Sequence, residues 1–538
     1  MMKVSAILAA LLVVVGLVAA QTPPIVTSES NLLSDQYDIV VFINDVGTGL
    51  GTELASIENA ISGYKQVNPK VGSASNVIPY PDHPSRKLIF ASTGDLSSDL
   101  ADSRDIYNAA KAAMDKVIAM KLRKILLVVG PMLTALPHYN WAMKHNPKLT
   151  AALGALHSLY VPIQVREMTS TKQKFNRLGL FQFGDKLANS TLAVSQGVAV
   201  YRDIGNGDPI RMAAPRIAEY LEERRAAWEA AGINMKIVEP NERDHPMAWA
   251  VNRAVKEVPE LSGRIIYLTY TPKGPIDQTL LLVGKGVTID TGGADLKING
   301  GMYGMHNDKM GAASVAGFFE ILSHLQPKGL KVFGYMPYIR NGLDKHAYLP
   351  DEIIVARNGM RVRIGNTDAE GRVILSDVLD EARQQALKEV NPHIFTIATL
   401  TGAAVKAYGK VQVSMDNLPA RKVNMAQSLS DAGDDIADPC EVARVRYEDY
   451  QVNYGISEYE DIMQFNTLPG STSKRGFTFP MGYLALISGL SNHGLSSQSP
   501  LPYTHTDIAP SSGGIGTYGT GSPLRMYANR FILPRVLP

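Results

Sequence analysis

The most informative stretch of the chain lies at residues 279–310, which read TLLLVGKGVTIDTGGADLKINGGMYGMHNDKM. Its first residues, Thr279–Val283, form an apolar run that ends at a glycine, which is typical of a buried strand. Lys285 and Asp290 follow closely, so both are expected near the carboxyl end of that strand. Open α/β sheets bind their ligands at this edge. The stretch therefore predicts an α/β fold with a functional site there.

A second motif carries the charged residues that complete the candidate site. The first stretch contributes Lys297 and Asp308, both in glycine-rich surroundings. Residues 364–377 read IGNTDAEGRVILSD and add Asp368, Glu370 and Arg372 just before an expected helix. Apolar residues at helical spacing indicate that helix: Leu375, Val378, Leu379 and Ala382.

Two divalent metals would explain why four carboxylates are brought together. Buried carboxylates repel one another unless cations neutralise them. Asp and Glu oxygens are suitable ligands for Zn²⁺, Mn²⁺ or Mg²⁺. A metal pair can share a bridging water and lower its pKa toward neutrality. A neighbouring lysine can ligate a metal when neutral or stabilise an oxyanion when charged.

Spacing alone also permits a purely structural interpretation of the same residues. Asp368 could cap the following helix, while Glu370 would favour its positive end. Arg372 could form an ordinary ion pair with a nearby acid. Both interpretations remain open at this level.

Strands and helices alternate along the rest of the chain, which favours a largely parallel sheet covered by helices. The pattern restarts after residue 203, so a domain boundary is expected near residue 200. The first half has expected strands at 37–43, 87–91 and 124–129 and a helix at 103–121. The second half has an expected helix at 215–230 and strands at 236–238, 264–270 and 279–283.

Composition excludes some classes of protein. The 538 residues include 53 Lys and Arg against 51 Asp and Glu, a net charge of +2, which argues against a nucleic-acid binder. Hydrophobic residues make up 45%, as in a globular chain. Cys440 is the single cysteine, so no intrachain disulfide is possible, and it is interpreted as a buried small hydrophobe.

The amino terminus resembles a targeting segment. Lys3 precedes an apolar run, Val4–Ala20, that ends in small residues, which predicts a signal peptide over residues 1–20 cleaved near Gln21. An uncleaved signal anchor is the competing interpretation. Cleavage would place the protein in the secretory lumen or outside the cell, without stable membrane insertion. There the Asn189-Ser190-Thr191 sequon could be glycosylated.

A glycine-rich turn at residues 47–51, GTGLG, could in principle cradle a phosphate. Its third glycine is misplaced for the dinucleotide pattern, and no clear ribose-binding acid follows. A tight strand-to-helix turn explains these glycines better.

Two motifs resemble those of a known enzyme family. NTDAEGR, residues 366–372, resembles the signature of the leucyl aminopeptidases, the dinuclear-zinc cytosol aminopeptidases. GKGVTIDTGG, residues 284–293, resembles that family's GKGxxFDSGG. The spacing also matches, with seven residues from Asp290 to Lys297 and eleven from Lys297 to Asp308. Further similar segments are RDIGNGDPIRMAAP (202–215), ATLTGA (398–403) and THTDIAP (504–510).

The resemblance implies a role for each matching side chain. One metal would be held by Lys285, Asp290, Asp308 and Glu370, and the other by Asp290, Asp368 and Glu370. Lys297 would polarise the scissile carbonyl, and Arg372 would hold a bicarbonate ion as general base. The substrate's free α-amine would bind one metal. Met305, Thr399 and Gly402 would cradle the first side chain, and Leu400 would offer a backbone contact, although core packing also explains these four.

The resemblance also implies an architecture. It predicts an N-terminal macro-like α/β domain over residues 21–200 and a larger zinc-peptidase-like α/β catalytic domain over residues 201–538. Family members assemble as hexamers with enclosed active sites, so a homo-hexamer acting on peptides is expected, with no nucleic-acid partner.

The sequence departs from the family pattern at one place beside the site. The family usually has Asp-Met-Gly-Gly where this chain has Asp308-Lys309-Met310-Gly311, a feature similar to a divergent animal branch of probable aminopeptidases. His505 and Asp507 look like a metal pair but match a structural strand of the family. The prediction is a metalloaminopeptidase that releases apolar, leucine-like amino-terminal residues. The alternative is an inactive, metal-stabilised oligomer with a structural or binding role.

Overall fold

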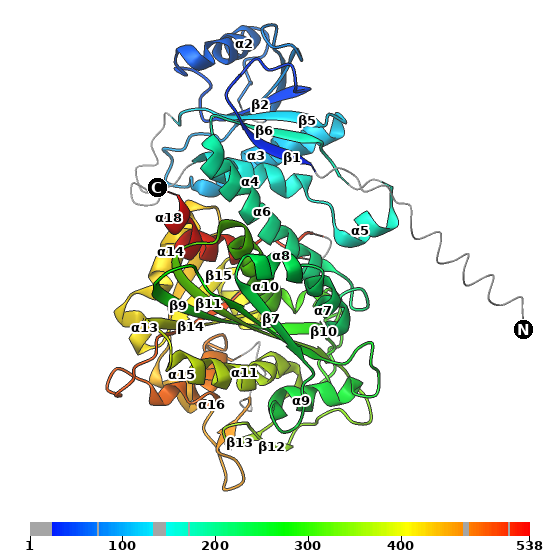
Figure 1. Ribbon diagram of the computed structural model, residues 1–538, viewed down its shortest axis with the longest axis vertical. Helices are drawn as coiled ribbons and strands as arrows, with labels where there is room; N and C mark the ends of the chain where they lie inside the picture. The colour runs from blue at the N-terminus through cyan, green and yellow to red at the C-terminus, as the bar shows by residue number, and fades with distance from the viewer. Residues whose placement is uncertain are drawn as a thin grey trace, which may run out of the picture.

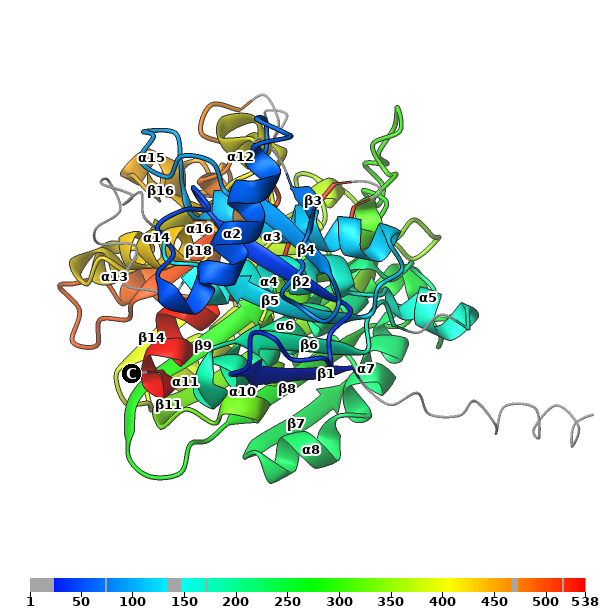
Figure 2. The ribbon, with the colours of Figure 1, turned by 90° about the horizontal axis from the view of Figure 1, so that it is seen from above.

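Two sheets organise the chain in the computed structural model, which describes residues 24–72, 75–132, 147–170, 173–465, 473–514 and 517–537. The smaller sheet lies at one end of the molecule and the larger at the other (Figure 1). Seen from above, the smaller sheet is stacked over the larger (Figure 2). The predicted signal peptide lies outside the described residues.

The smaller sheet has six strands in the order β1-β6-β5-β2-β4-β3, parallel except for β3 against β4. Alternate residues of β2 face opposite sides, so Val40 and Phe42 pack under α2 while Val41 and Ile43 face α3 and α4. The strands are β1 (Ile25–Glu29), β2 (Ile39–Asn44), β3 (Asn76–Pro79), β4 (Lys87–Ser92), β5 (Lys124–Val129) and β6 (Arg177–Phe181). The helices are α2 (Ala55–Lys65), α3 (Ser103–Ala119), α4 (Pro147–Leu159) and α5 (Ile163–Met168).

The larger sheet has nine strands, eight in the order β16-β15-β18-β14-β9-β11-β8-β7, with β10 beside β11. Its strands are β7 (Ile233–Val238), β8 (Arg264–Tyr270), β9 (Ile276–Gly284), β10 (Gly286–Asp290), β11 (Gly329–Asn341), β14 (Pro392–Ala398), β15 (Gln412–Asp416), β16 (Cys440–Arg444) and β18 (Tyr503–Asp507). A small sheet joins β12 (Ile353–Val355), β13 (Arg361–Arg363) and β17 (Ile462–Met463). The three sheets, together with the helices around them, confirm the predicted α/β class.

Helices cover both faces of the larger sheet. On β9, Leu280 and Leu282 pack on the side of α10, while Leu281 and Val283 pack on the side of α11. The helices of this half are α7 (Ala214–Glu222), α8 (Arg225–Ala230), α9 (Pro246–Asn252), α10 (Met310–Leu325), α11 (Glu370–Ala386), α12 (Gly402–Tyr408), α13 (Leu418–Lys422), α14 (Met425–Asp435), α15 (Tyr447–Gln451), α16 (Phe479–Ile487), α17 (Leu524–Tyr527) and α18 (Leu533–Val536). Because both faces are covered, the buried part of β9, Leu280–Val283, is apolar on both sides of the sheet.

Helix α6 (Gly184–Asn206) connects the two halves and packs along α10. The predicted boundary at residue 200 lies within this helix, and Asn189 is exposed on it. Its contact with α10 depends on glycines: a Cβ built on Gly197 would lie 2.5 Å from the Gly317 carbonyl oxygen, and one on Gly317 would lie 2.5 Å from the Gly197 oxygen. One hydrophobic core extends from the smaller sheet through this contact to the larger.

Most predicted elements lie where the pattern placed them, but the helix expected at 215–230 is two helices. Helix α7 ends at Glu222 and α8 begins at Arg225. The break allows Trp228 to be buried, with its indole N–H donating to Glu320 of α10 at 2.9 Å. Periodicity could not reveal this break, because both helices are amphipathic.

The glycine-rich turn at residues 47–51 is already bonded within the chain. The backbone N–H groups of Gly49 and Leu50, which a phosphate would need, donate to the Glu58 carboxylate at 2.8 and 2.9 Å. Gly47, Gly49 and Gly51 all have positive φ, so glycine serves the turn.

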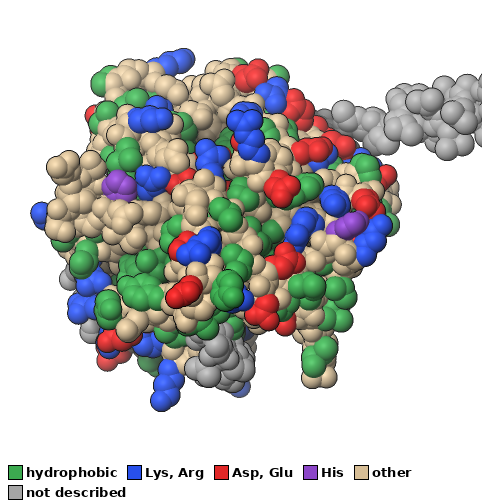
Figure 3. Space-filling model, turned by 90° about the horizontal axis from the view of Figure 1, so that it is seen from below, with side chains coloured by type: hydrophobic (Ala, Val, Ile, Leu, Met, Phe, Trp, Pro, Cys, Tyr) green, Lys and Arg blue, Asp and Glu red, His purple; other side chains and the backbone are tan. Residues whose placement is uncertain are grey.

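The surface seen from below mixes charges of both signs among apolar side chains (Figure 3). Neither sign dominates the part of that face formed by described residues. None of the helices in the described ranges combines the length and hydrophobicity needed to cross a membrane.

We predict that Gly197→Ala destabilises the protein, because its methyl group has no space between α6 and α10. Overpacking of this kind costs about 1–3 kcal/mol, measurable as a lower melting temperature. The matched control is Gly63→Ala in α2, where an added Cβ meets nothing within 4 Å. That substitution should be neutral or slightly stabilising, and equal losses in both variants would contradict the packing argument.

Candidate active site

The chain brings its acidic residues together at the carboxyl edge of the larger sheet. Lys285 follows β9, and Asp290 ends β10. Asp308 lies just before α10, and Glu370 begins α11. Two strand ends and two helix starts thus meet at one place; the sequence predicted the end of β9 and the start of α11 there, but neither β10 nor α10.

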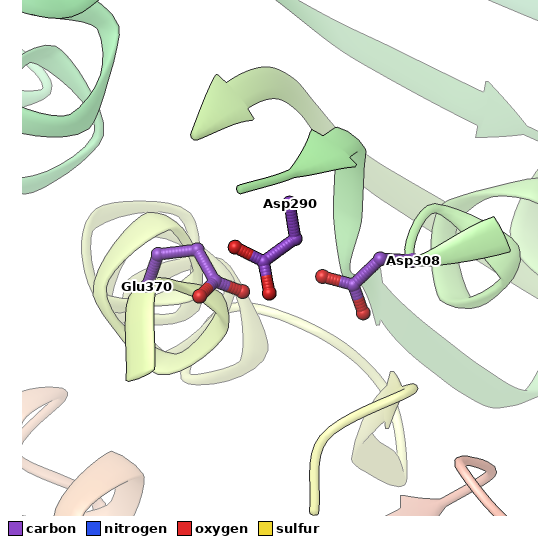
Figure 4. Close-up of side chains that lie close together, drawn as sticks. All are labelled: Asp290, Asp308 and Glu370. Carbon is purple, nitrogen blue, oxygen red and sulfur yellow. The ribbon is translucent and has the colours of Figure 1, made fainter. Parts of the chain in front are cut away.

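Three of these carboxylates form a compact, buried cluster. One oxygen each from Asp290, Asp308 and Glu370 lies within 4.8 Å of the other two. Figure 4 shows the three side chains pointing toward one another from separate elements. All three are at least 95% buried. Asp368 is closest to solvent, with a side chain 34% exposed.

Two lysines neutralise this cluster. The Lys285 Nζ lies 2.8 Å from Asp308 Oδ1 and 2.9 Å from Glu370 Oε1, and it donates to the Thr399 carbonyl oxygen at 2.8 Å. The Lys297 Nζ lies 2.8 Å from Asp290 Oδ2 and also contacts Asp368. Each lysine therefore bridges two carboxylates.

The pKa values reflect crowding of buried charge. Burial, reinforced by Asp290, raises the pKa of Asp368 to about 7. Burial also raises the pKa of Asp308 and of Glu370, where neighbouring carboxylates add to the effect. For Lys285, burial favours a lower pKa, but the surrounding carboxylates outweigh it and the pKa is raised. The cluster therefore has more negative charge than its lysines comfortably balance.

Divalent metals fit this donor set. Asp308 Oδ2 is buried, and no hydrogen-bond partner for it lies among the described residues. An orphaned carboxylate oxygen inside an acidic cluster is costly unless a cation binds it. All candidate ligands are hard oxygen donors except the Lys285 amine, which suits Zn²⁺ or Mn²⁺.

Glycines make room for the lysine at the centre of the cluster. A Cβ on Gly371 would lie 2.4 Å from Lys285 Cε, so any side chain there would displace the lysine. A Cβ on Gly311 would lie 2.1 Å from the Ile397 carbonyl oxygen, which explains how α10 starts so close to β14.

Arg372 lies in the first turn of α11 and contacts the segment that contains Gln464 and Phe465. Its Nη1 donates to the Gln464 carbonyl oxygen at 3.1 Å, and its guanidinium lies 5.3 Å from the centre of the Phe465 ring. Burial lowers the pKa of Arg372 to about 10, so it stays charged at neutral pH. Its Nε is buried without a partner among the described residues, which fits a small anion such as bicarbonate.

A cavity of about 710 Å³ opens onto these groups. All eleven residues singled out from the sequence line this cavity: Lys285, Asp290, Lys297, Met305, Asp308, Asp368, Glu370, Arg372, Thr399, Leu400 and Gly402. Sequence reasoning missed other lining residues, including Tyr303, Asn366, Val405, Phe465 and Phe479. Asn366 lies inside the NTDAEGR motif and could have been found there, whereas the aromatic residues follow no motif.

Lys309 bonds through its ammonium to backbone oxygens and not to the carboxylate cluster. It is completely buried, and its ammonium donates to the backbone oxygens of Gly207 at 3.1 Å and Thr288 at 3.4 Å, and also to that of His306. The substitution that distinguishes this chain from the family pattern therefore changes internal packing and leaves the carboxylates in place.

His505 and Asp507 support the site from β18 and lie outside the carboxylate cluster. Asp507 accepts hydrogen bonds from the Leu400 N–H and the Thr401 hydroxyl, at 3.1 and 2.6 Å. His505 pairs with Thr396 at 2.7 Å inside the sheet. This placement agrees with their interpretation as parts of a structural strand.

Comparison with known proteins decides the family. The sequence profile of the cytosol aminopeptidase family, catalytic domain, matches residues 199–527. The chain is 36% identical to the "Putative aminopeptidase W07G4.4" of Caenorhabditis elegans over 514 residues, 93% of this chain and 96% of the relative. The chain belongs to the cytosol aminopeptidase family. It is accordingly a metal-dependent aminopeptidase, and the inactive structural alternative is not favoured.

Two solved structures share the fold. The bottromycin maturation enzyme BotP in complex with Mn has a TM-score of 0.72 at 22% identity, covering 92% of this chain and 98% of BotP. A mutant of tomato leucine aminopeptidase has a TM-score of 0.74 at 19% identity, covering 95% of this chain and 97% of the tomato protein. At these identities the likeness concerns the fold, an N-terminal domain followed by a catalytic domain.

We predict that Lys309 makes stability depend on pH. Burial lowers the pKa of Lys309 from 10.5 to about 7. Between pH 7 and pH 10.5 the folded chain then binds fewer protons than the unfolded chain. The free energy of unfolding should therefore rise in this range by up to about 1.4 kcal/mol per pH unit. Lys309→Met should remove this rise in the metal-free protein, as measured by denaturant melts at pH 7 and 9.

The matched control for that prediction is Lys331→Met, since Lys331 is paired with Glu389 at 2.9 Å elsewhere in the sheet. It should retain the pH dependence of the wild type. An unchanged slope in Lys309→Met would contradict the assignment.

Proposed function

We propose that the protein releases apolar, leucine-like amino-terminal residues from peptides, using two divalent metal ions held by its buried carboxylates. The observation that carries this proposal is the convergence of Asp290, Asp308 and Glu370 on one point, where Asp308 Oδ2 has no hydrogen-bond partner among the described residues. Lys285, Asp290, Asp308 and Glu370 would hold one ion, and Asp290, Asp368 and Glu370 the other. When bound, such a pair supplies an activated water and polarises the substrate carbonyl.

The remaining charged residues have distinct tasks in this proposal. Lys297 lies at the cavity wall, where its ammonium can donate to the scissile carbonyl and stabilise the oxyanion. Arg372 would hold a bicarbonate ion that accepts a proton from the attacking water. The Leu400 N–H is already bonded to Asp507, so a substrate contact from Leu400 has to use its carbonyl oxygen.

The preference for apolar residues follows from the character of the cavity walls. Met305, Val405, Phe465 and Phe479 all line the cavity, and none carries a charge. Thr399 donates its hydroxyl hydrogen to Asp308 at 2.8 Å, so this polar side chain is already bonded. An apolar substrate side chain would pack against these apolar walls without disturbing the Thr399–Asp308 hydrogen bond.

We predict that the protein hydrolyses a leucyl chromogenic amide only when supplied with Zn²⁺ or Mn²⁺. Lys297→Ala should lower kcat by about 10²–10³, the usual cost of losing an oxyanion donor. Asp308→Ala should abolish turnover through loss of metal. Initial rates with and without a chelator, in buffers with and without bicarbonate, measure these effects.

The control is Lys331→Ala, which breaks a partly buried lysine–glutamate pair away from the cavity. It should retain the wild-type kcat. Chelator-resistant turnover, or full activity of Asp308→Ala, would refute the metal assignment. If the folded, metal-loaded wild type hydrolyses no substrate in a panel of different amino-terminal residues, the inactive, structural interpretation would be favoured instead.

Location and assembly form a further part of the proposal. The apolar run at residues 4–20 supports export, the exposed Asn189 supports glycosylation, and family resemblance supports a homo-hexamer. Protein recovered from the medium of expressing animal cells should begin at Gln21, lose mass on deglycosylation and have the native mass of six chains. Retention of residues 1–20 would contradict cleavage, an unglycosylated Asn189 would contradict modification, and a monomer would contradict assembly.

A further inference from the structure

Asn341 lies beside the carboxylate cluster although neither motif contains it. It is the last residue of β11 and is completely buried. In the register of β10 and β11 it is the direct partner of Asp290. Its backbone oxygen also accepts from the N–H and the hydroxyl of Thr291, at 3.1 and 3.0 Å. The residue is thus fixed against the segment that carries Asp290.

The Asn341 carboxamide connects the two motifs. Its Nδ2 lies 2.8 Å from Asp290 Oδ1, 3.0 Å from the Thr367 carbonyl oxygen and 3.4 Å from Glu370 Oε2. An amide nitrogen has two hydrogens, so one serves Asp290 and the other lies between Thr367 and Glu370. Asp290 belongs to the first motif, and Thr367 and Glu370 belong to the second.

The other end of the same carboxamide is unpaired. Asn341 Oδ1 is buried and has no hydrogen-bond partner among the described residues. An unsatisfied buried oxygen disfavours the folded state, and an apolar side chain of similar size would avoid it. The geometry therefore indicates that the side chain is retained for its amino end.

From this we infer that Asn341 is a positioning residue, which orients Asp290 and Glu370 for metal binding. The inference rests on the proposed function, in which these two carboxylates hold both ions. Groups that bond to metal ligands from outside fix the orientation of those ligands. Asn341 does this without a charge, whereas the ammonium of Lys297 competes with a metal for the Asp290 carboxylate, and Lys285 has to lose a proton before its amine can bind a metal.

The experiment compares Mn²⁺ binding by wild-type protein, Asn341→Leu and Asn252→Leu, using calorimetric titration of the purified, chelator-treated chain. Asn252 is the matched control because it is also buried in this half and bonds, through Oδ1, to the Gly263 N–H at 2.7 Å, away from the cavity. Asn341→Leu should weaken Mn²⁺ binding by about 10–100-fold, the usual effect of losing such a partner. Asn252→Leu should bind Mn²⁺ as the wild type does.

Melting curves of the metal-free proteins separate positioning from a merely structural role. Both variants are expected to melt earlier than the wild type, but only Asn341→Leu should lose affinity. Asn341→Ser, which is too short to reach both motifs, replaces Asn341→Leu if that variant does not fold and should show the same loss.

Three outcomes would overturn the inference or its basis. Wild-type Mn²⁺ affinity in the Asn341 variants would show that the residue does not position the ligands. An equal loss in Asn252→Leu would show that general destabilisation is the cause. Absence of Mn²⁺ binding by folded wild-type protein would instead refute the proposed function, so the two failures are distinguishable.

Discussion

The structure depends on one constraint: the negative charge of its buried carboxylates has to be balanced. Three carboxylates within 4.8 Å of one another, with Asp368 beside them, cannot be buried unless cations accompany them. Lys285 and Lys297 supply two positive charges, each between two carboxylates. Burial raises the pKa of Asp308 and of Glu370, and neighbouring carboxylates add to the effect, so two lysines leave part of the negative charge uncompensated. A divalent ion held by these carboxylates would complete the balance and would supply the chemistry proposed for the site.

The fold serves this cluster by bringing distant segments to one edge. Parallel strands β9 and β10 end there, and α10 and α11 begin there, so charged residues between positions 285 and 370 meet at this edge. Gly371 and Gly311 allow the close approach, because a side chain at either position would collide with Lys285 or with the backbone of β14. The smaller sheet is joined to this arrangement through α6, whose contact with α10 extends the hydrophobic core.

Much of the fold and the site could be predicted from local sequence signals. An apolar run predicts the strand at 124–129, and two motifs predict the cluster of Asp290, Asp308 and Glu370. Both signals come from residues that are close together in the sequence. The break between α7 and α8 could not be predicted, because it depends on the hydrogen bond between Trp228 and Glu320, which are far apart in the sequence. The direction of Lys309 could not be predicted either, because its partners are backbone oxygens from distant residues. The place of Asn341 could not be predicted for the same reason, since only the strand register puts it beside Asp290.

Anomalous scattering from crystals grown with Mn²⁺ would test the central claim most directly. The account predicts two peaks per chain inside the cavity, one among Lys285, Asp290, Asp308 and Glu370 and one among Asp290, Asp368 and Glu370. It also predicts that the ammonium of Lys297 moves away from Asp290 and Asp368. A cavity without peaks, with both lysines still bonded to the carboxylates, would contradict it.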